Sequence, residues 1–497
     1  MLQVNLNFNE FYKLAQSHTG IVLSTQLVFD TSSPLTVFNS FKNEREFVFL
    51  EGVSSHEQHG RYSYLALDSH LSMICEKEAY FIIQNKTKKK IKGTVYDGLE
   101  HILNKYNFPN STSDFESGIL GNLSYECIEH LENVSITSSR DLNTPYAAFM
   151  VPKTIIVFDR LYHNVKICHS VFLDNTKPYL EAELKQLYDS AISNMTTIVK
   201  KMDSLEKIQP TFLLNTINNY DKIEYECNIS KSQFLKNVQT CLDYIKNGDI
   251  FQIQVSRRAA VPYSKDPFHL YRYLRNFNPS PLLFNLKLAN YQLIGASPEI
   301  LVNVNKNNMF IRPIAGTRKR YSSSKSESEI IHELIHDEKE KAEHIMLVDL
   351  ARNDVGRACI GDSVKVNQLM GIEKYAHVIH MVSDVSGTLK ESCSSVDALK
   401  YGFPAGTVTG TPKIRAVEII AELENCHREF YSGGIVFFDF NNNLKSALSI
   451  RTICIKDGVA YTQAAGGVVA DSVPELEFKE TENKMRSSLS AMAQFGD

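Results

Sequence analysis

The sequence predicts an α+β fold in which large, mostly antiparallel sheets pack against helices. Three observations indicate this class. Short runs of β-branched and aromatic residues follow one another with only brief turns between them. Amphipathic helical segments are scattered among these runs, and no regular alternation of strand and helix, which would build a parallel sheet, is present. With 497 residues, of which 43% are hydrophobic, the chain can bury a large core.

Residues 1–205 form the first part of the chain, and strand patterns dominate them. Strands are expected at Phe47–Leu50, Tyr62–Leu65, Ala79–Ile83 and Thr154–Phe158. Helical patterns lie at Val95–Tyr106, Tyr125–Glu132 and Lys177–Met202. The polar residues 206–228 are expected to connect this part to a second one, residues 229–497.

The second part opens with a helix whose ends are marked in the sequence. Ser230 and Gln233 form a capping box, an apolar stripe follows at helical spacing, and Gly248 stands at the end. Strands are then expected at Phe251–Val261, Leu283–Leu288, Ile300–Val304, Met309–Ile314 and Leu448–Thr452.

Two acidic patterns far apart in the chain point to a functional site. Each places two carboxylates three residues apart on a predicted helix, and the pairs are Glu340 with Glu343 and Glu477 with Glu480. Residues three apart share a helix face, so each helix can offer two oxygen ligands to one side. Magnesium usually takes one or two protein carboxylates and leaves its other positions to water and an anionic substrate. Such charge runs are also typical of solvated helix surfaces, so both interpretations stay open at this point.

The ends of these two helices are also marked in the sequence. Ser326 and Glu329 are expected to cap the helix that carries the first pair. The last helix is expected to begin at about Pro474, and Lys484 follows the second pair on the same face. An acid-acid-base face is suited to holding a metal beside a substrate carboxylate.

Two other segments have the chemistry to bind an anion. The loop Phe403–Lys413 is rich in glycine and leads into a predicted helix, Lys413–Glu424, with Pro412 as its first residue. Its spacing does not fit a nucleotide-phosphate loop, so a carboxylate is the better ligand. Arg451 lies among apolar residues of a predicted strand, where it would pair with a buried glutamate or grip a substrate carboxylate.

Composition excludes several functional classes. The chain has 53 Lys and Arg residues against 57 Asp and Glu residues, so no basic excess indicates nucleic-acid binding. Its longest apolar stretches are too short to span a membrane. The nine cysteines include no Cys-x-x-Cys pair, so neither a disulfide framework nor a zinc knuckle is indicated. We therefore expect a cytoplasmic protein without nucleic-acid or membrane partners.

Five segments, in their order along the chain, carry a family resemblance. They are Pro313–Arg318, Asp337–His344, Leu347–Asp354, His377–Gly387 and Phe403–Gly406. Together they closely resemble the motifs of the chorismate-utilising enzymes and, within that family, the anthranilate synthase branch. The resemblance covers residues 220–497 almost continuously and, more weakly, residues 30–66 and 117–159. It implies two intertwined subdomains that form an α/β sandwich.

The resemblance implies that the acidic pairs form a magnesium site. Glu343 and Glu480 would hold Mg²⁺, and Glu340 and Glu477 would support them. The ion would bind the ring carboxylate of chorismate. Other residues would bind the substrate, namely Tyr431, Arg451, Lys484, Ala465, Gly466 and Gly467 at the enolpyruvyl carboxylate, with Ala315 and Gly316 also in the substrate site.

The resemblance also implies catalytic roles. Glu299 matches the family's general acid, which protonates the departing ring hydroxyl, and burial would raise its pKa for this task. Thr317 would lie near the leaving group, and His377 would assist proton removal when pyruvate is eliminated. Gln252 stands where water-using relatives carry a lysine, and it cannot act as a base. Ala315 stands where another branch carries a nucleophilic lysine.

These two missing lysines favour direct attack by ammonia. The implied reaction is the Mg²⁺-dependent amination of chorismate, with elimination of pyruvate to give anthranilate, the first step of tryptophan biosynthesis. The ammonia would come from a separate glutamine amidotransferase subunit, component II, in a hetero-oligomer. Two alternatives stay open: an aminodeoxychorismate or aminodeoxyisochorismate synthase, and a catalytically silent regulatory partner of the amidotransferase.

The feedback site of tryptophan-inhibited relatives is matched only in part. The corresponding residues are Glu51, Gly52, Asn278, Pro279, Ser280 and Pro281. Gly52 replaces the serine of that motif, and Leu282–Leu283 replaces the usual Tyr-Met pair. Loss of a hydrogen-bonding hydroxyl and altered packing predict weak inhibition by tryptophan. Ala465–Gly466 also reverses the usual Gly-Ala order beside the carboxylate site.

Overall fold

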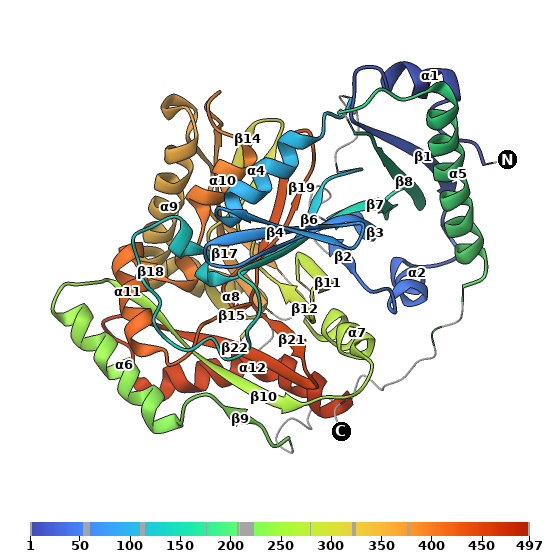
Figure 1. Cartoon of the computed structure of the whole chain (residues 1–497). Coiled ribbons are helices and arrows are strands. Elements are labelled where there is room, and N and C mark those ends of the chain that lie inside the picture. Colours follow the sequence, from blue (N-terminus) through green and yellow to red (C-terminus); the bar gives the residue numbers. More distant parts are fainter. Residues whose placement is uncertain are drawn as a thin grey trace.

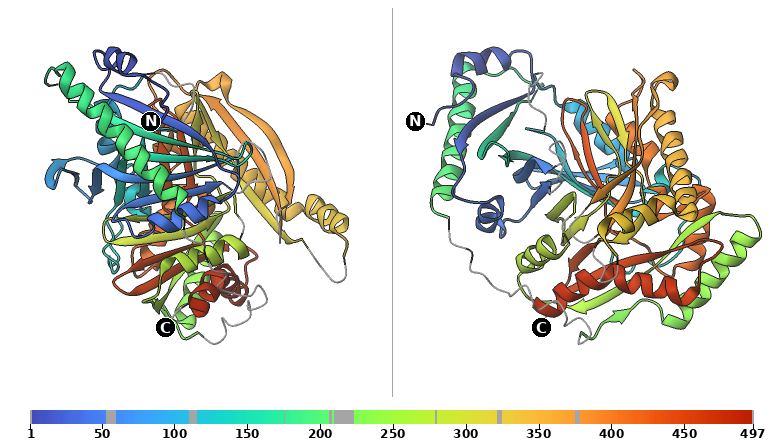
Figure 2. Two further views of the ribbon diagram at one scale, coloured as in Figure 1. Left: turned by 90° about the vertical axis from the view of Figure 1, so that its right-hand side faces the viewer. Right: turned by 180° about the vertical axis from the view of Figure 1, so that it is seen from behind.

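The computed structural model is shown in Figures 1 and 2. It describes residues 2–52, 60–109, 115–174, 176–205, 208, 223–278, 280–320, 325–374 and 378–495. Most of the expected connection, His377 and Pro279 therefore lie outside the described residues, as does the side chain of Thr317.

The elements follow the predicted mixture of strands and helices. Up to residue 205 they are α1 (Phe8–Leu14), β1 (Gly20–Val28), α2 (Pro34–Phe41), β2 (Phe47–Gly52), β3 (Tyr62–Cys75), β4 (Ala79–Gln84), β5 (Thr87–Lys92), α4 (Val95–Lys105), β6 (Ile119–Leu123), the 3-10 helix η1 (Tyr125–His130), β7 (Ala147–Asp159), β8 (Asn164–Phe172) and α5 (Glu181–Asp203). From residue 223 to residue 336 they are β9 (Glu226–Cys227), α6 (Lys231–Lys246), β10 (Gln252–Pro262), α7 (Pro267–Phe277), β11 (Leu282–Leu288), β12 (Tyr291–Ser297), β13 (Asn303–Asn305), β14 (Asn308–Ile311), β15 (Ile314–Lys319) and α8 (Glu327–His336). The remainder comprises α9 (Glu338–Ala358), η3 (Gly361–Ser363), β16 (Lys365–Lys374), β17 (Val378–Thr388), α10 (Ser395–Gly402), η4 (Gly406–Val408), β18 (Gly410–Thr411), α11 (Lys413–Leu423), β19 (Gly434–Phe438), β20 (Leu444–Leu448), β21 (Thr452–Lys456), β22 (Val459–Val468) and α12 (Pro474–Phe495).

The sheets are antiparallel. Among the described residues, every pairing between the labelled strands runs in this sense, from β1 with β8 to β21 with β22. This confirms the predicted α+β class. Antiparallel pairing suits a chain whose strands are joined mainly by short turns.

Strands from the two parts of the sequence alternate within the sheets. β11 pairs on one side with β12 and on the other with β2 of the first part. β19 pairs likewise with β20 and with β6. In Figure 1 the blue and cyan strands of the first part accordingly lie among yellow and orange strands of the second. The second part of the sequence thus relies on the first part for sheet partners.

The hydrophobic cores mix the two parts as well. Phe38 of α2 stacks on Phe49 of β2 with 4.6 Å between ring centroids, and its ring lies 5.8 Å from that of Phe268 in α7. All three side chains are buried. Burial of aromatic rings contributes strongly to stability, so these contacts join the first part firmly to the second.

Three predictions of local structure are wrong. Ser326 and Glu329 cap α8, a separate helix that ends at His336. The helix that carries Glu340 and Glu343 is α9, which begins after Asp337. The Asp337 backbone is extended, and its carboxylate accepts hydrogen bonds from the backbone N–H groups of Lys339 and Glu340. This cap ends one helix and starts the next.

The second error concerns the strand expected at Leu448–Thr452. β20 ends at Leu448, and β21 begins only at Thr452. Because β20 pairs with β19 whereas β21 pairs with β12 and β22, the chain must change direction between them. Arg451 lies in this turn with φ of 52°. Pro412 similarly precedes α11 as its cap and is not the first helical residue.

Candidate active site

A cavity of about 550 Å³ lies where strands, helices and loops of the second part converge. α9 and α12 supply acidic side chains, β10 supplies two glutamines, and the turn before β21 supplies Arg451. The cavity has the size of a small-molecule site and is rich in charged groups.

The two acidic helix faces meet in this cavity, since Glu340, Glu343, Glu477 and Glu480 all line it. Arg318 donates to Glu340 through Nη1 at 2.6 Å. The four carboxylates are therefore not equivalent, because Glu340 and Glu480 have cationic partners, Arg318 and Lys484 respectively. The solvated-surface interpretation does not hold for them.

Negative charge accumulates around Glu343 and Glu477. Burial, together with the neighbouring charges of Glu340 and Glu480, raises the pKa of Glu343. Burial also raises the pKa of Glu477 to about 7, and the Glu480 carboxylate adds to this effect against a hydrogen bond from Ser472. The second carboxylate oxygen of Glu477 is buried and accepts no hydrogen bond from any residue that the structure describes.

This arrangement fits a divalent cation. A cation would relieve the repulsion and satisfy the buried oxygen of Glu477. Within the described ranges no three His, Cys, Asp or Glu side chains already form a metal cage. Magnesium does not require one, because water and substrate oxygens complete its shell.

Two basic side chains, Lys484 and Arg451, line the cavity beside the carboxylates. Burial raises the pKa of Glu480, but the nearby Lys484 ammonium outweighs it, so the pKa of Glu480 is lowered. Lys484 Nζ lies 2.7 Å from Glu480 Oε1 and donates to the carbonyl oxygen of Ala465 at 2.9 Å. Of the three glycine-rich positions expected at the substrate carboxylate, Gly467 lines the cavity, whereas Ala465 and Gly466 do not.

Arg451 is placed to receive an anion. It donates through Nη1 to the carbonyl oxygen of Lys484 at 2.9 Å. Among the described residues it forms no ion pair, so the structural pairing left open by the sequence is not made. Its left-handed backbone is uncommon for a residue with a side chain, and such strain clusters at functional sites.

Glu299 lies in the cavity with a partner that the sequence did not reveal. Burial raises the pKa of its carboxyl group to about 7, while a hydrogen bond from Thr407 and the charge of Lys484 oppose this rise. Thr407 Oγ1 donates to Glu299 Oε1 at 2.6 Å. The glycine-rich loop around Thr407 was recognised in the sequence as an anion-binding segment. The sequence of the loop does not show which carboxylate it contacts.

A histidine missed from the sequence also lines the cavity. His380 of β17 lies in its wall, and burial, with the charge of Arg451, lowers its pKa to about 4. The motif contains two histidines three residues apart, and nothing in the sequence chooses between them. His377 lies outside the described residues.

The remaining substrate-site residues are distributed around the cavity. Ala315, Gly316 and Tyr431 line it, and burial raises the pKa of Tyr431 to about 12. Gly316 has φ of 60°, and a Cβ there would lie 3.2 Å from a Glu340 oxygen. Glycine therefore keeps this wall open.

The residues of the expected tryptophan site lie elsewhere. Glu51 is fully buried and accepts hydrogen bonds from Tyr271 and Arg275. Gly52 and Pro281 line a separate pocket of about 90 Å³. Ser280 is buried, and the side-chain nitrogen of Asn278 is buried without a hydrogen-bond partner among the described residues.

Comparison with known proteins places the chain in a family. A model of chorismate binding enzymes matches residues 54–490, so fold and site define a chorismate-binding enzyme. The chain is 37% identical to anthranilate synthase component 1 of Acetivibrio thermocellus, over 97% of each chain. It is 35% identical to the protein of that name from Aquifex aeolicus, over 99% of this chain and 98% of the relative. The chain belongs to the anthranilate synthase component I family.

Solved structures agree with this assignment. Anthranilate synthase component I from Streptococcus pneumoniae superposes with a TM-score of 0.73 at 31% identity, covering 93% of this chain and 99% of that one. The isochorismate synthase MenF from Escherichia coli has a TM-score of 0.69 at 15% identity, covering 98% of both chains, and shares the fold. In the described part of the chain no helix has the length and apolar character needed to cross a membrane.

Proposed function

We propose that this chain converts chorismate and ammonia to anthranilate, pyruvate and water. One observation carries the proposal: a single cavity brings two acidic helix faces together with the basic groups of Arg451 and Lys484, and a protonatable Glu299 lies in its wall. Chorismate carries two carboxylates, and these two charged regions offer a place for each.

The positive groups orient the enolpyruvyl carboxylate. Arg451 has a free face toward the cavity and Lys484 lies beside it, while the Tyr431 hydroxyl offers a further donor. Glu343 and Glu480, supported by Glu340 and Glu477, would hold Mg²⁺ in the same cavity. When bound, Mg²⁺ would neutralise the ring carboxylate and withdraw electrons from the ring.

Two side chains move protons. As ammonia forms its bond to the ring, the ring C–O bond breaks and Glu299 gives its proton to the hydroxyl, which leaves as water. We assign the second transfer to His380, which lines the cavity and is neutral near pH 7. It removes the ring proton as the enolpyruvyl C–O bond breaks, so that pyruvate leaves and the ring becomes aromatic. Thr317 stays a proposed neighbour of the leaving group.

The choice of ammonia over water rests on Gln252. Its side-chain nitrogen donates to Glu343 at 3.1 Å, which fixes the amide orientation. The amide oxygen is buried, has no hydrogen-bond partner within the described part of the chain, and can accept an N–H of ammonia. Ala315 in the cavity wall offers no amine, which argues against an aminodeoxychorismate synthase.

The proposal includes a partner and a division of labour. A glutamine amidotransferase subunit, component II, supplies ammonia in a hetero-oligomer, and the assembly is cytoplasmic. Residues 229–497 form the catalytic part, and residues 1–205 form an N-terminal part that completes its sheets.

The product formed by the purified chain tests the function. Chorismate, ammonium and Mg²⁺ should yield fluorescent anthranilate, and addition of EDTA should abolish the signal. Accumulation of a nonfluorescent aminated product would instead indicate an aminodeoxychorismate or aminodeoxyisochorismate synthase. No turnover together with firm binding of the amidotransferase would indicate the silent partner.

Regulation by tryptophan is proposed to be weak, because Gly52 lacks the serine hydroxyl. A titration of activity against tryptophan, with Gly52→Ser as the comparison, tests this. Inhibition of the unmodified chain at low micromolar concentration would contradict it.

A further inference from the structure

A buried arginine outside the cavity joins three of its walls. Arg428 is 1% exposed and does not line the cavity. Its guanidinium donates through Nη1 to the carbonyl oxygen of Val408 and through Nη2 to that of Gln254, both at 2.7 Å. It also lies 5.7 Å from the ring centroid of Tyr431. Val408, Gln254 and Tyr431 all line the cavity.

A buried carboxylate fixes the orientation of this guanidinium. Glu424 accepts from Nε and Nη2 of Arg428, each at 2.8 Å. The same carboxylate accepts from the backbone N–H of Ser256 at 2.8 Å and from its hydroxyl at 2.7 Å. A planar fork of donors makes this pattern, and a lysine ammonium cannot reproduce it.

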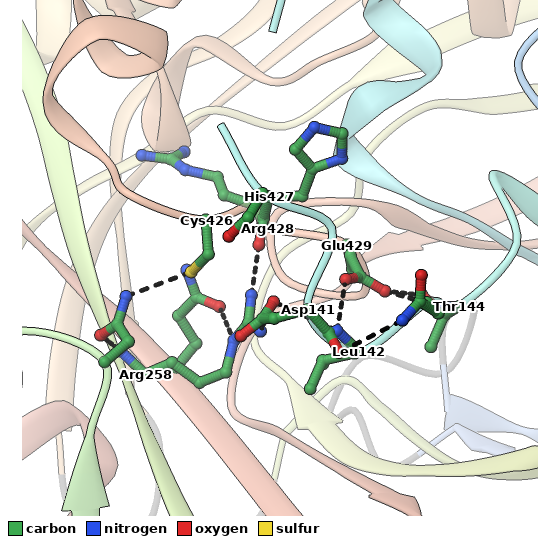
Figure 3. A network of polar contacts seen from close by, with 12 residues as sticks. Asp141, Leu142, Thr144, Arg258, Cys426, His427, Arg428 and Glu429 are labelled. Carbon is green, nitrogen blue, oxygen red and sulfur yellow. Dashed lines mark hydrogen bonds and ion pairs between the residues drawn. The ribbon is translucent and has the colours of Figure 1, made fainter. Parts of the chain in front are cut away.

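The backbone around Arg428 is anchored to the first part of the chain. Glu126 accepts from the backbone N–H groups of Arg428, at 2.8 Å, and of Glu429, at 3.1 Å. The Glu429 carboxylate holds the backbone N–H groups of Leu142, at 2.9 Å, and Thr144, at 2.7 Å, as Figure 3 shows. The side chain therefore extends toward the cavity walls from a fixed base.

One of these walls carries the partner of the general acid. Val408 follows Thr407 directly, and both lie at η4. We propose that Arg428 is a positioning residue for the acid step, because its hold on the Val408 carbonyl fixes the Thr407 hydroxyl against Glu299. The inference rests on the proposed function, in which Glu299 protonates the leaving hydroxyl.

The pH profile of kcat/KM tests this role. Glu299 must be protonated to act, so activity falls as pH rises through its pKa. Thr407 stabilises the charged form, and Lys484 is the charged group acting on Glu299. Loss of the hydrogen bond from Thr407 should raise the pKa of Glu299. The alkaline limb of the kcat/KM profile should therefore move to higher pH by about half a pH unit or more. Thr407→Val and Arg428→Lys should both do this.

The double variant and two controls complete the experiment. If Arg428 acts through Thr407, the combined variant shifts the limb no further than Thr407→Val alone. Arg61→Lys changes another bidentate arginine–carboxylate pair, the one with Asp159 outside the cavity, and should leave the alkaline limb in place. Glu424→Gln keeps the arginine but weakens the pair that orients it, so the alkaline limb should move to higher pH by a smaller amount. This variant replaces Arg428→Lys if the latter fails to fold.

The outcomes separate the two proposals. A parent chain that forms no anthranilate would overturn the proposed function. An active parent whose limb stays unchanged in folded Arg428→Lys or Glu424→Gln, whatever their loss of rate or thermal stability, would overturn the positioning role alone. Additive shifts in the double variant would do the same.

Discussion

At the residue scale, burial gives the cavity glutamates different tasks. Burial raises the pKa of both Glu299 and Glu477 to about 7, and each accepts a hydrogen bond from a hydroxyl group, but a neighbouring carboxylate, Glu480, adds to the rise only at Glu477. Glu480 has its pKa lowered because Lys484 outweighs burial. Glu299, which can exchange a proton, and Glu480, which stays charged, thus share one cavity. Their immediate neighbours set their different pKa values.

The raised pKa of Glu299 predicts the pH dependence of catalysis. The acid form is lost as pH rises through about 7, so kcat/KM should fall on the alkaline side of neutrality. Rate measurements from pH 5.5 to 9 check this. Glu299→Gln should lose about 10²-fold or more of kcat together with this alkaline limb. A profile flat to pH 9 in the unmodified chain would remove Glu299 as the acid.

The proposed metal site predicts a specific defect in Glu480→Gln. Removing one carboxylate should raise the Mg²⁺ concentration for half-maximal activity by about tenfold or more. Calorimetric titration of Mg²⁺ gives a readout besides activity. Glu482→Gln is the matched control, because it lies two residues further along α12 and outside the cavity. Unaltered Mg²⁺ affinity in Glu480→Gln would exclude this glutamate as a ligand.

At the element scale, the break between α8 and α9 orients the acidic face of α9, which carries Glu340 and Glu343, toward the cavity. The Asp337 carboxylate caps α9 and also accepts from Arg318 Nη2 at 2.8 Å, while the same guanidinium binds Glu340. The start of the helix and the first carboxylate of its acidic face are thereby fixed by one arginine. A single continuous helix would not present Glu340 and Glu343 in this way.

The cap predicts a graded response at position 337. Asp337→Ala should lower the free energy of unfolding by about 1–2 kcal/mol, because α9 loses its cap. Asp337→Asn keeps a capping oxygen and loses only a partly exposed ion pair, so its cost should be about 0.2–1 kcal/mol. Urea denaturation measures both. Equal losses in the two variants would show that the charge and not the cap matters.

Helical spacing explains how much of the site the sequence predicts. A spacing of three residues on a helix fixes a shared face, so Glu340 with Glu343 and Glu477 with Glu480 could be paired in advance. The prediction that the two faces meet in one cavity rested only on the ordered motifs and their family resemblance.

Contacts between loops could not be predicted in this way. Thr407 reaches Glu299 across two loops, and Arg451 lies in a turn imposed by the change of sheet partners. The α+β class followed from local patterns, whereas alternation of the two parts depends on pairings that no local pattern encodes.

At the scale of the whole molecule, the two parts of the sequence form one cooperative structure. β11 would expose an unpaired edge without β2, and β19 would do so without β6. The aromatic contacts of Phe38 with α7 would also be lost. The linear division of the chain is therefore not a division into units that fold independently.

A split chain tests this cooperativity. Residues 223–497 expressed alone should aggregate or show no cooperative thermal transition, because β11 and β19 lack partners. Co-expression with residues 1–205 should restore a soluble complex and a single transition in circular dichroism. A sharp transition and chorismate turnover from residues 223–497 alone would contradict the prediction.

The pairing of β6 with β19 has a consequence for synthesis of the protein. Ile119–Leu123 leaves the ribosome long before Gly434–Phe438, its partner on one side. During most of translation this apolar strand has an open edge, which is a site for association with other nascent chains. Contacts so distant in sequence also make folding slow. Cellular yield should therefore depend on chaperones that shield the first part until the last strands are made.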